Sequence, residues 1–271
     1  LKQRVLVAAV LLPIGLVAIY LGGVAFTAVV ALLLGLAGWE YAQLFHSGGY
    51  RPASALLVAG VLLIVAGRWW DGFESAPWII TLLVLASMTV HLVTYERGRD
   101  QAGSDFAVTL SGMLYIGWLG AYLVSVRSLP EGMWWVLLVL PAIWLADAGA
   151  YFIGRAFGRH KLSPRLSPKK TWEGYIGGIV VALIGTALLA VLWGRLSGPG
   201  SAIMWLDGGI LGLVLAVVAP LGDLGESMIK RQFGIKDSGK ILPGHGGAFD
   251  RIDSWLWAAA IGYYLIIWLL L

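Results

Sequence analysis

The chain has 271 residues, of which 59% are hydrophobic and 13% charged, and its mean hydropathy is +0.83. This composition excludes an ordinary soluble domain and predicts an integral membrane protein with lipid as its solvent. The formal net charge of +4 is modest, so nucleic-acid binding is not the expected function. Because the sequence contains no cysteine, disulfides, thiolate nucleophiles and cysteine metal ligands are excluded, and any metal needs oxygen or histidine ligands.

Segments long and apolar enough to span a membrane recur along the whole chain. The first follows Lys2 and Arg4 as a signal peptide would, but no small-residue cleavage site comes after it, so we take it as a helix of the mature protein. The sequence therefore predicts an all-α, polytopic transmembrane bundle of about nine spanning helices. Their ranges are 5–21, 24–45, 54–67, 77–94, 106–126, 133–154, 174–194, 208–224 and 254–271.

The distribution of basic residues predicts the orientation. Lysine and arginine in short loops favour the cytoplasmic side. If the N-terminus is cytoplasmic, nine crossings place every lysine and arginine on that side except Arg68, Arg127 and Arg195. We therefore expect an external C-terminus and an inner-membrane protein whose active site faces the cytoplasm. No loop is long enough to bury a core of its own, so we expect one membrane domain, 1–271, with N-terminal helices in about 1–100 and a catalytic, cytoplasm-facing portion in about 140–271.

Acidic residues gather at the predicted cytoplasmic ends of the last two helices. If the eighth helix continues past the membrane surface, one face carries Asp223, Glu226, Ser227 and Lys230. Asp250 and Asp253 share the first turn of the ninth helix, near its positive end. Carboxylates in such a pattern suit Mg²⁺, which commonly bridges to substrate phosphates. Asp223 and Asp253 lie near the ends of predicted spans, and a charge within the apolar region costs about 2.5–3.5 kcal/mol on insertion scales. This cost favours a partner or a function for them over an ordinary charged loop.

Basic and glycine residues in the same C-terminal segment suit a phosphate ligand. Gly246 and Gly247 leave backbone N–H groups able to approach an anion closely. The spacing from Gly234 to Lys240 is that of a P-loop, but Ile241 replaces the hydroxyl residue that would bind Mg²⁺, so we reject that motif. The candidates for phosphate neutralisation are Lys169, Lys170, Lys230, Arg231, Lys236 and Arg251.

A second polar cytoplasmic segment, 154–174, is interrupted by prolines that prevent a helix. Ser167, Lys169 and Lys170 in this segment suit a phosphate-rich ligand near an anionic membrane, although an ordinary positive-inside loop is an equal alternative. Asp147 and Tyr151 lie four residues apart on the inner half of the sixth predicted helix. These two residues either form a buried hydrogen-bonded pair that stabilises the bundle or take part in the site, and the sequence leaves both alternatives open.

Three stretches together resemble the signature of the phosphatidate cytidylyltransferase family, also called CDP-diacylglycerol synthases. They are 227–231 (Ser-Met-Ile-Lys-Arg), 236–237 (Lys-Asp) and 245–253 (His-Gly-Gly-Ala-Phe-Asp-Arg-Ile-Asp). The stretch 167–174 (Ser-Pro-Lys-Lys-Thr-Trp-Glu-Gly) is similar to a second family segment. The resemblance implies conversion of CTP and phosphatidate, a membrane lipid, to CDP-diacylglycerol and pyrophosphate, with Mg²⁺ required.

The resemblance also implies roles for individual residues. Asp223 and Asp250 would be ligands of a paired cation site, with Asp253 as a further candidate ligand and Asp237 near it. We assign His245 as a candidate orienting group. The identity of a second cation stays open. The partners expected are CTP, phosphatidate and membrane lipid, with no nucleic acid, and a homodimer through small-residue helix faces is an added alternative.

Two other functions compete with this interpretation. A CTP-dependent lipid kinase acting on a polyprenol-type alcohol would need the same nucleotide and metal, but it would release CDP instead of pyrophosphate. A secondary transporter is the second alternative, because charged residues within spans often mark ion pathways. Transporters tend to place polar groups near the bilayer midplane, whereas the polar groups here are predicted at the cytoplasmic end.

Overall fold

The computed structural model describes residues 2–239 and 246–270, and the chain divides into two compact units. Unit 1 contains 1–125 and 229–252, and unit 2 contains 126–228 and 253–271. The helices α9 (Trp205–Gln232) and α10 (Phe249–Leu265) each contribute residues to both units. We describe each unit by itself, and the single membrane domain expected from the sequence stays a prediction.

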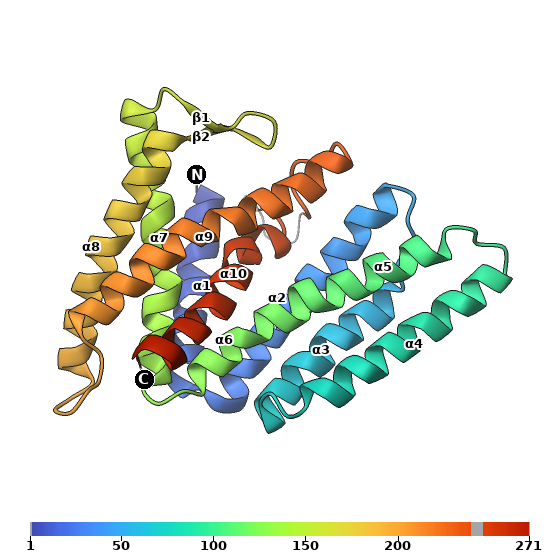
Figure 1. Ribbon diagram of the computed structural model, residues 1–271, viewed down its shortest axis with the longest axis horizontal. Helices are drawn as coiled ribbons and strands as arrows, with labels where there is room; N and C mark the ends of the chain where they lie inside the picture. The colour runs from blue at the N-terminus through green and yellow to red at the C-terminus, as the bar shows by residue number, and fades with distance from the viewer. Residues whose placement is uncertain (1, 240–245, 271) are drawn as a thin grey trace. The chain divides into compact units, whose positions relative to one another are not determined.

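Unit 1 is built mainly from the N-terminal helices, seen in blue to green in Figure 1. Helix α2 packs against α3, and α3 packs against α4 and against a π-helical turn, η1, that interrupts the fifth predicted span. The buried surfaces of these helices are largely apolar, as expected for helices of an apolar bundle. The elements are α1 (Lys2–Leu21), α2 (Gly23–Ser47), α3 (Ser54–Asp71), α4 (Ala76–Glu96), α5 (Ala102–Gly112), η1 (Met113–Trp118) and α6 (Leu119–Arg127), of which Val126 and Arg127 belong to unit 2.

Arg68, near the end of α3, is a buried cation inside unit 1, with an exposed fraction of 4%. Its guanidinium carbon lies 3.6 Å from the ring centroid of Phe73 and 4.5 Å from that of Trp118. Its Nη1 donates to the hydroxyl of Ser125 at 3.0 Å. Cation–π contacts of this kind contribute about 2 kcal/mol or more when desolvated, so the aromatic rings compensate for the burial of the charge.

Unit 2 is organised around the close packing of α7 (Gly132–Phe157) and α8 (Trp172–Leu196). A Cβ on Gly178 would lie 2.5 Å from the carbonyl oxygen of Ala146, and one on Gly174 would lie 2.6 Å from that of Ala150. The two glycines form a Gly-x-x-x-Gly pair, the spacing that lets membrane helices approach with their backbones in contact. The unit also contains most of α9, most of α10 and the π-helical turn η2 (Ile266–Leu270).

A β-hairpin connects α7 to α8. Strand β1 (Lys161–Ser163) pairs in antiparallel register with β2 (Ser167–Thr171), and Lys161 lies opposite Thr171. The Thr171 hydroxyl then caps α8 by accepting from the N–H of Gly174 at 3.2 Å. At the base of the hairpin, Glu173 accepts from His160 Nδ1 at 2.6 Å. The prediction that prolines keep this segment from being helical is therefore confirmed, and the strands are an addition to it.

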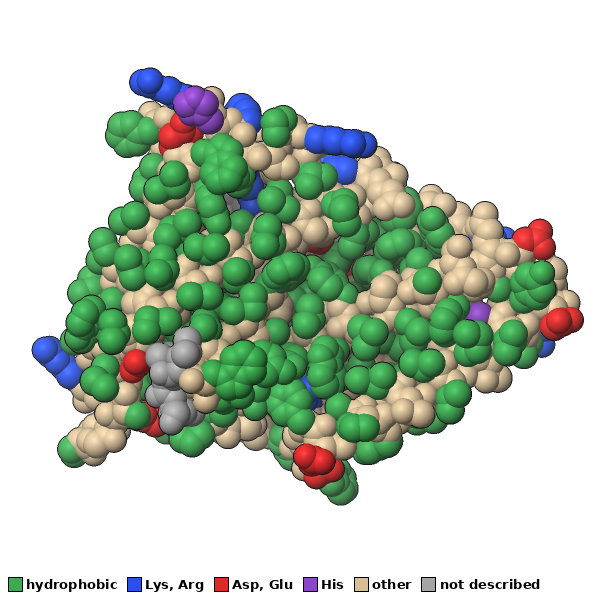
Figure 2. Space-filling model, in the orientation of Figure 1, with side chains coloured by type: hydrophobic (Ala, Val, Ile, Leu, Met, Phe, Trp, Pro, Cys, Tyr) green, Lys and Arg blue, Asp and Glu red, His purple; other side chains and the backbone are tan. Residues whose placement is uncertain are grey.

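The helical membrane architecture predicted from the sequence is confirmed in its coarse form. Each of the nine predicted ranges falls on helical residues as far as the described residues reach, which is residue 270 for the ninth. Within the described ranges, seven helices are long and apolar enough to cross a membrane: 23–47, 54–71, 76–96, 102–127, 132–157, 172–196 and 205–232. Figure 2 shows hydrophobic side chains over most of the visible helical surface, as lipid exposure requires. The count of nine spans and the orientation of the termini stay predictions.

Candidate functional site

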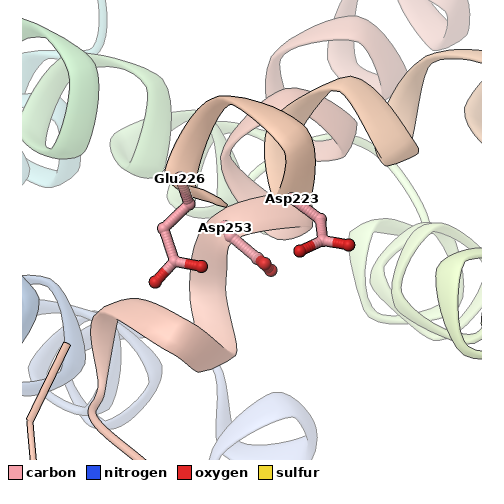
Figure 3. Close-up of side chains that lie close together, drawn as sticks. All are labelled: Asp223, Glu226 and Asp253. Atoms are coloured by element: carbon pink, nitrogen blue, oxygen red, sulfur yellow. The ribbon is translucent and has the colours of Figure 1, made fainter. Parts of the chain in front are cut away.

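Three carboxylates meet in unit 2, and we call Asp223, Glu226 and Asp253 the acidic cluster. One carboxylate oxygen from each lies within 4.8 Å of those of the other two. Figure 3 shows the three side chains gathered between adjacent turns of α9 and α10. Glu226 is buried, with an exposed fraction of 1%, while the other two are half-buried. The sequence prediction that Asp223 and Asp253 come together agrees with this geometry.

Local helix geometry explains how the acidic cluster forms. Asp223 and Glu226 are three residues apart on α9, so their side chains project from the same face. Gly222 lets α10 approach this face, because a Cβ there would lie 2.5 Å from the backbone oxygen of Asp253. Asp253 stands near the start of α10, and its Oδ1 accepts from the N–H of Ser254 at 2.6 Å. The carboxylate thus lies near the positive end of the helix.

The donor set of the acidic cluster fits a hard divalent cation. Three carboxylate oxygens this close repel one another unless positive charge lies between or beside them. Mg²⁺ prefers oxygen ligands, and it keeps several coordination positions for water and for substrate phosphates. A small set of carboxylates is therefore enough to bind it. Glu226 was recognised in the sequence only as sharing the face of Asp223. Its place three residues after Asp223 is the signal that makes it a candidate ligand.

Lys170 of the hairpin forms an ion pair with Asp223. Both side chains are about 30% exposed, at 28% and 32%, so solvent screens the pair and its contribution to stability is small. The pair brings one predicted phosphate-binding cation next to one predicted metal ligand.

A cavity of about 410 Å³ lies beside this ion pair within unit 2. Basic side chains from α7 and the hairpin form one part of its wall, and small apolar residues of α7, α8 and α9 form another. Asp147 and Tyr151, for which the sequence left two alternatives, also line it. The lining includes Asp147, Tyr151, Arg155, Lys169, Lys170, Ala146, Ala150, Gly178, Ala216 and Pro220.

Asp250 belongs to a separate group in unit 1. Its Oδ1 accepts from Lys230 Nζ at 2.6 Å, and the two side chains are 6% and 10% exposed. Its Oδ2 accepts from the Ser238 N–H and hydroxyl, both at 2.9 Å, and from the Gly247 N–H at 2.7 Å. The structure thus pairs two predicted site residues, Asp250 and Lys230. The Gly247 N–H, which the sequence predicted to approach a phosphate, donates to the Asp250 carboxylate.

The remaining predicted residues have fewer contacts. The Arg231 side chain donates to the backbone oxygen of Ile235 at 3.0 Å and is exposed. Gly246 has a φ of 81° and lies against the Asp250 carboxylate, where a Cβ would be 2.5 Å from Oδ2. Ser167 begins β2. Lys236, Asp237 and Arg251 are exposed, and His245 lies outside the described residues.

Comparisons with known proteins agree along the whole chain. A family model described as the Cytidylyltransferase family matches residues 2–269. A protein of Brucella suis biovar 1 is 37% identical over 265 residues, which is 97% of this chain and 92% of that protein. Relatives from Pseudomonas aeruginosa and Synechocystis sp. are 37% and 32% identical, each over 99% of this chain and 97% of their own length. All three carry the name phosphatidate cytidylyltransferase.

Proposed function

The chain belongs to the cytidylyltransferase family, and from this premise we propose that it transfers CMP from CTP to phosphatidate, giving CDP-diacylglycerol and pyrophosphate. The names of the relatives, with 37% identity across 97% of this chain, support the reaction. The observation from the fold that carries it is the acidic cluster at the junction of two apolar helices, with Lys170 on one of its carboxylates. A membrane helix keeps such charges where they serve a function.

We propose that Asp223, Glu226 and Asp253 hold Mg²⁺. When bound, the metal neutralises the charge of the CTP phosphates and of the departing pyrophosphate. Lys170 stands beside Asp223 and adds positive charge where two anionic substrates must meet. Asp250 holds the Lys230 ammonium in a fixed position, which suits a role for Lys230 on a substrate phosphate. A role for Asp250 as a ligand of a second cation stays a prediction.

The reaction needs positioning more than proton transfer. An oxygen of the phosphatidate phosphate attacks the α-phosphorus of CTP, a new P–O bond forms, and the bond to the β-phosphate oxygen breaks to release pyrophosphate. A phosphate monoester has its second pKa near 6 and is largely ionised at neutral pH, so no strong general base is required. The cavity joins basic residues to apolar walls, and this combination suits a lipid headgroup that enters with its acyl chains.

The proposed function is tested with purified protein, phosphatidate, labelled CTP and Mg²⁺. We expect CDP-diacylglycerol and pyrophosphate in equal amounts, and no turnover when EDTA removes the metal. In a parallel reaction with a polyprenol in place of phosphatidate, formation of CDP and a phosphorylated polyprenol would instead identify a lipid kinase. Substrate flux into sealed vesicles without CTP turnover would identify a transporter. We further propose an inner-membrane protein whose site faces the cytoplasm, as the positive-inside distribution supports.

A further inference from the structure

Glu40 is a buried acid in the C-terminal third of an otherwise uncharged helix. It is the one acidic residue of α2, Gly23–Ser47, and its exposed fraction is 3%. A charged side chain within a membrane helix is costly and persists where the surrounding protein uses it. The sequence motifs did not single it out, because no other acid lies near it along the chain. Its partners come from the C-terminal end of unit 1.

The Glu40 carboxylate binds the segment that leads into α10. Its Oε2 accepts from the backbone N–H of Phe249 at 2.9 Å and from the hydroxyl of Ser238 at 3.1 Å. Phe249 is the first residue of α10, whose first N–H groups have no partner within the helix. Glu40 therefore caps α10 from a different helix, across 209 residues of sequence.

The backbone on both sides of the carboxylate is too close for any side chain. A Cβ on Gly239 would lie 2.2 Å from Glu40 Oε1, and a Cβ on Gly247 would lie 2.1 Å from Oε2. Among the described residues, Oε1 is buried without a hydrogen-bond partner. Leaving such an oxygen unsatisfied costs about 1–3 kcal/mol or more. An apolar residue of similar shape would avoid this penalty, but it would remove the acceptor of the Phe249 N–H, so the site requires a carboxylate that is held by the start of α10.

Ser238 connects Glu40 to Asp250. The Ser238 hydroxyl lies 3.1 Å from Glu40 Oε2 and 2.9 Å from Asp250 Oδ2, and it has one proton to donate. The charge and position of Glu40 therefore affect how Ser238 holds Asp250. Asp250 in turn fixes Lys230, and it lies one turn before Asp253 on α10.

We propose that Glu40 is a positioning residue for nucleotidyl transfer: it fixes the start of α10 so that Asp250 and Lys230 have the geometry that metal and phosphate binding require. This inference rests on the proposed function and adds a residue to it. Glu40 acts through Ser238 and the Phe249 amide and does not touch the substrates. Residues that orient ligands through hydrogen bonds typically change metal affinity or activity 10–100-fold when replaced.

The test compares Glu40→Gln and Glu40→Asp with the control Glu96→Gln, which changes an exposed acid at the end of α4. Glutamine has nearly the same shape as glutamate but is uncharged and has one accepting oxygen. Aspartate keeps the negative charge, but its side chain is shorter by one methylene, so the carboxylate lies farther from Phe249 and Ser238. Rates are measured per folded molecule, after size-exclusion chromatography, as a function of Mg²⁺ concentration. The Mg²⁺ concentration for half-maximal thermal stabilisation is measured on the same samples.

We expect kcat to fall about 10-fold or more in Glu40→Gln. The Mg²⁺ concentrations that give half-maximal rate and half-maximal thermal stabilisation should each rise several-fold. A purely structural residue would change the yield of folded protein and leave both Mg²⁺ dependences at the wild-type values, which would overturn the proposal. If Glu40→Gln does not fold, the same readouts on Glu40→Asp decide. Inactive wild-type protein would contradict the proposed function itself, whereas an active wild type with wild-type-like Glu40 variants would contradict only the role of Glu40.

Discussion

Glu226 and Asp223 occupy successive turns of one face of α9, and Glu226 is the more buried of the two. If the acidic cluster holds Mg²⁺, replacement of Glu226 by Gln removes one charged ligand and leaves the helix intact. We expect Glu226→Gln and Asp223→Asn each to lower kcat by about 100-fold or more, the effect of losing one electrostatic group at a reacting centre. The measurement is CDP-diacylglycerol formation against Mg²⁺ concentration.

Glu74→Gln, which changes an exposed acid in the loop after α3, is the control for this pair and should keep wild-type rates. Wild-type rates in Glu226→Gln, with unchanged Mg²⁺ dependence, would remove Glu226 from the metal site. They would leave the cluster as a set of acids that are merely close in space.

The sequence predicts that some acidic residues lie close together, but it does not predict the partner of every charged side chain. Asp223 and Asp253 are expected to be close because both lie at the predicted cytoplasmic ends of consecutive spans, where a charged side chain is costly unless it has a partner or a function. The partners of Lys170 and Glu40 could not be inferred in the same way. Ser238 is 198 residues from Glu40, and the contact depends on how α2 packs in unit 1, which no local periodicity specifies.

The contact of α7 with α8 depends on glycines that leave room for the backbone of the other helix, and Gly178 is one of them. A Cβ on Gly178 would meet the backbone oxygen of Ala146 at 2.5 Å, and backbone cannot yield as a side chain can. We expect Gly178→Ala to destabilise the protein by about 1–3 kcal/mol, the usual effect of overpacking. Thermal unfolding in detergent measures this as a lower midpoint.

Gly209→Ala is the matched control for this change. It lies in α9, and its Cβ would meet Leu183 and Ala187 at 3.6 and 3.8 Å, which are ordinary contacts. Because alanine is favoured over glycine in a helix by about 1 kcal/mol, the control should be neutral or slightly stabilising. Equal midpoints for the two variants would contradict the backbone contact between α7 and α8.

Helix positions were well predicted, whereas helix ends and irregular turns were not. The eighth predicted range stopped at 224, but α9 continues to Gln232, because its charged last turns keep their helical form outside the apolar stretch. The π-helical turn at Met113–Trp118 has no marker in hydropathy, since its residues are as apolar as their neighbours. The register of the β-hairpin depends on strand pairing between Lys161 and Thr171, which composition does not reveal.

Across the whole chain, the separation of basic from apolar residues is the property that sets the membrane orientation. The hairpin before α8 contains several basic residues, whereas the connection after α8 is short, with Arg195 at the helix end. Helix α8 has 25 residues and a length of about 37 Å, enough for a hydrocarbon layer of about 30 Å. The preference of positive residues for the cytoplasmic side then predicts that the hairpin lies inside and that the residues after Leu196 lie outside.

The absence of native cysteine makes this orientation directly testable, because each introduced cysteine is the one thiol in the chain. Arg165→Cys places a thiol on the exposed hairpin, and Pro199→Cys places one in the exposed loop between α8 and α9. In right-side-out vesicles a membrane-impermeant maleimide should label the variant at 199 and spare the variant at 165, and inverted vesicles should give the reverse. Labelling of both variants from one side would mean that α8 does not cross the bilayer, and the reverse pattern would place the hairpin, with Lys170, on the external face, away from cytoplasmic CTP.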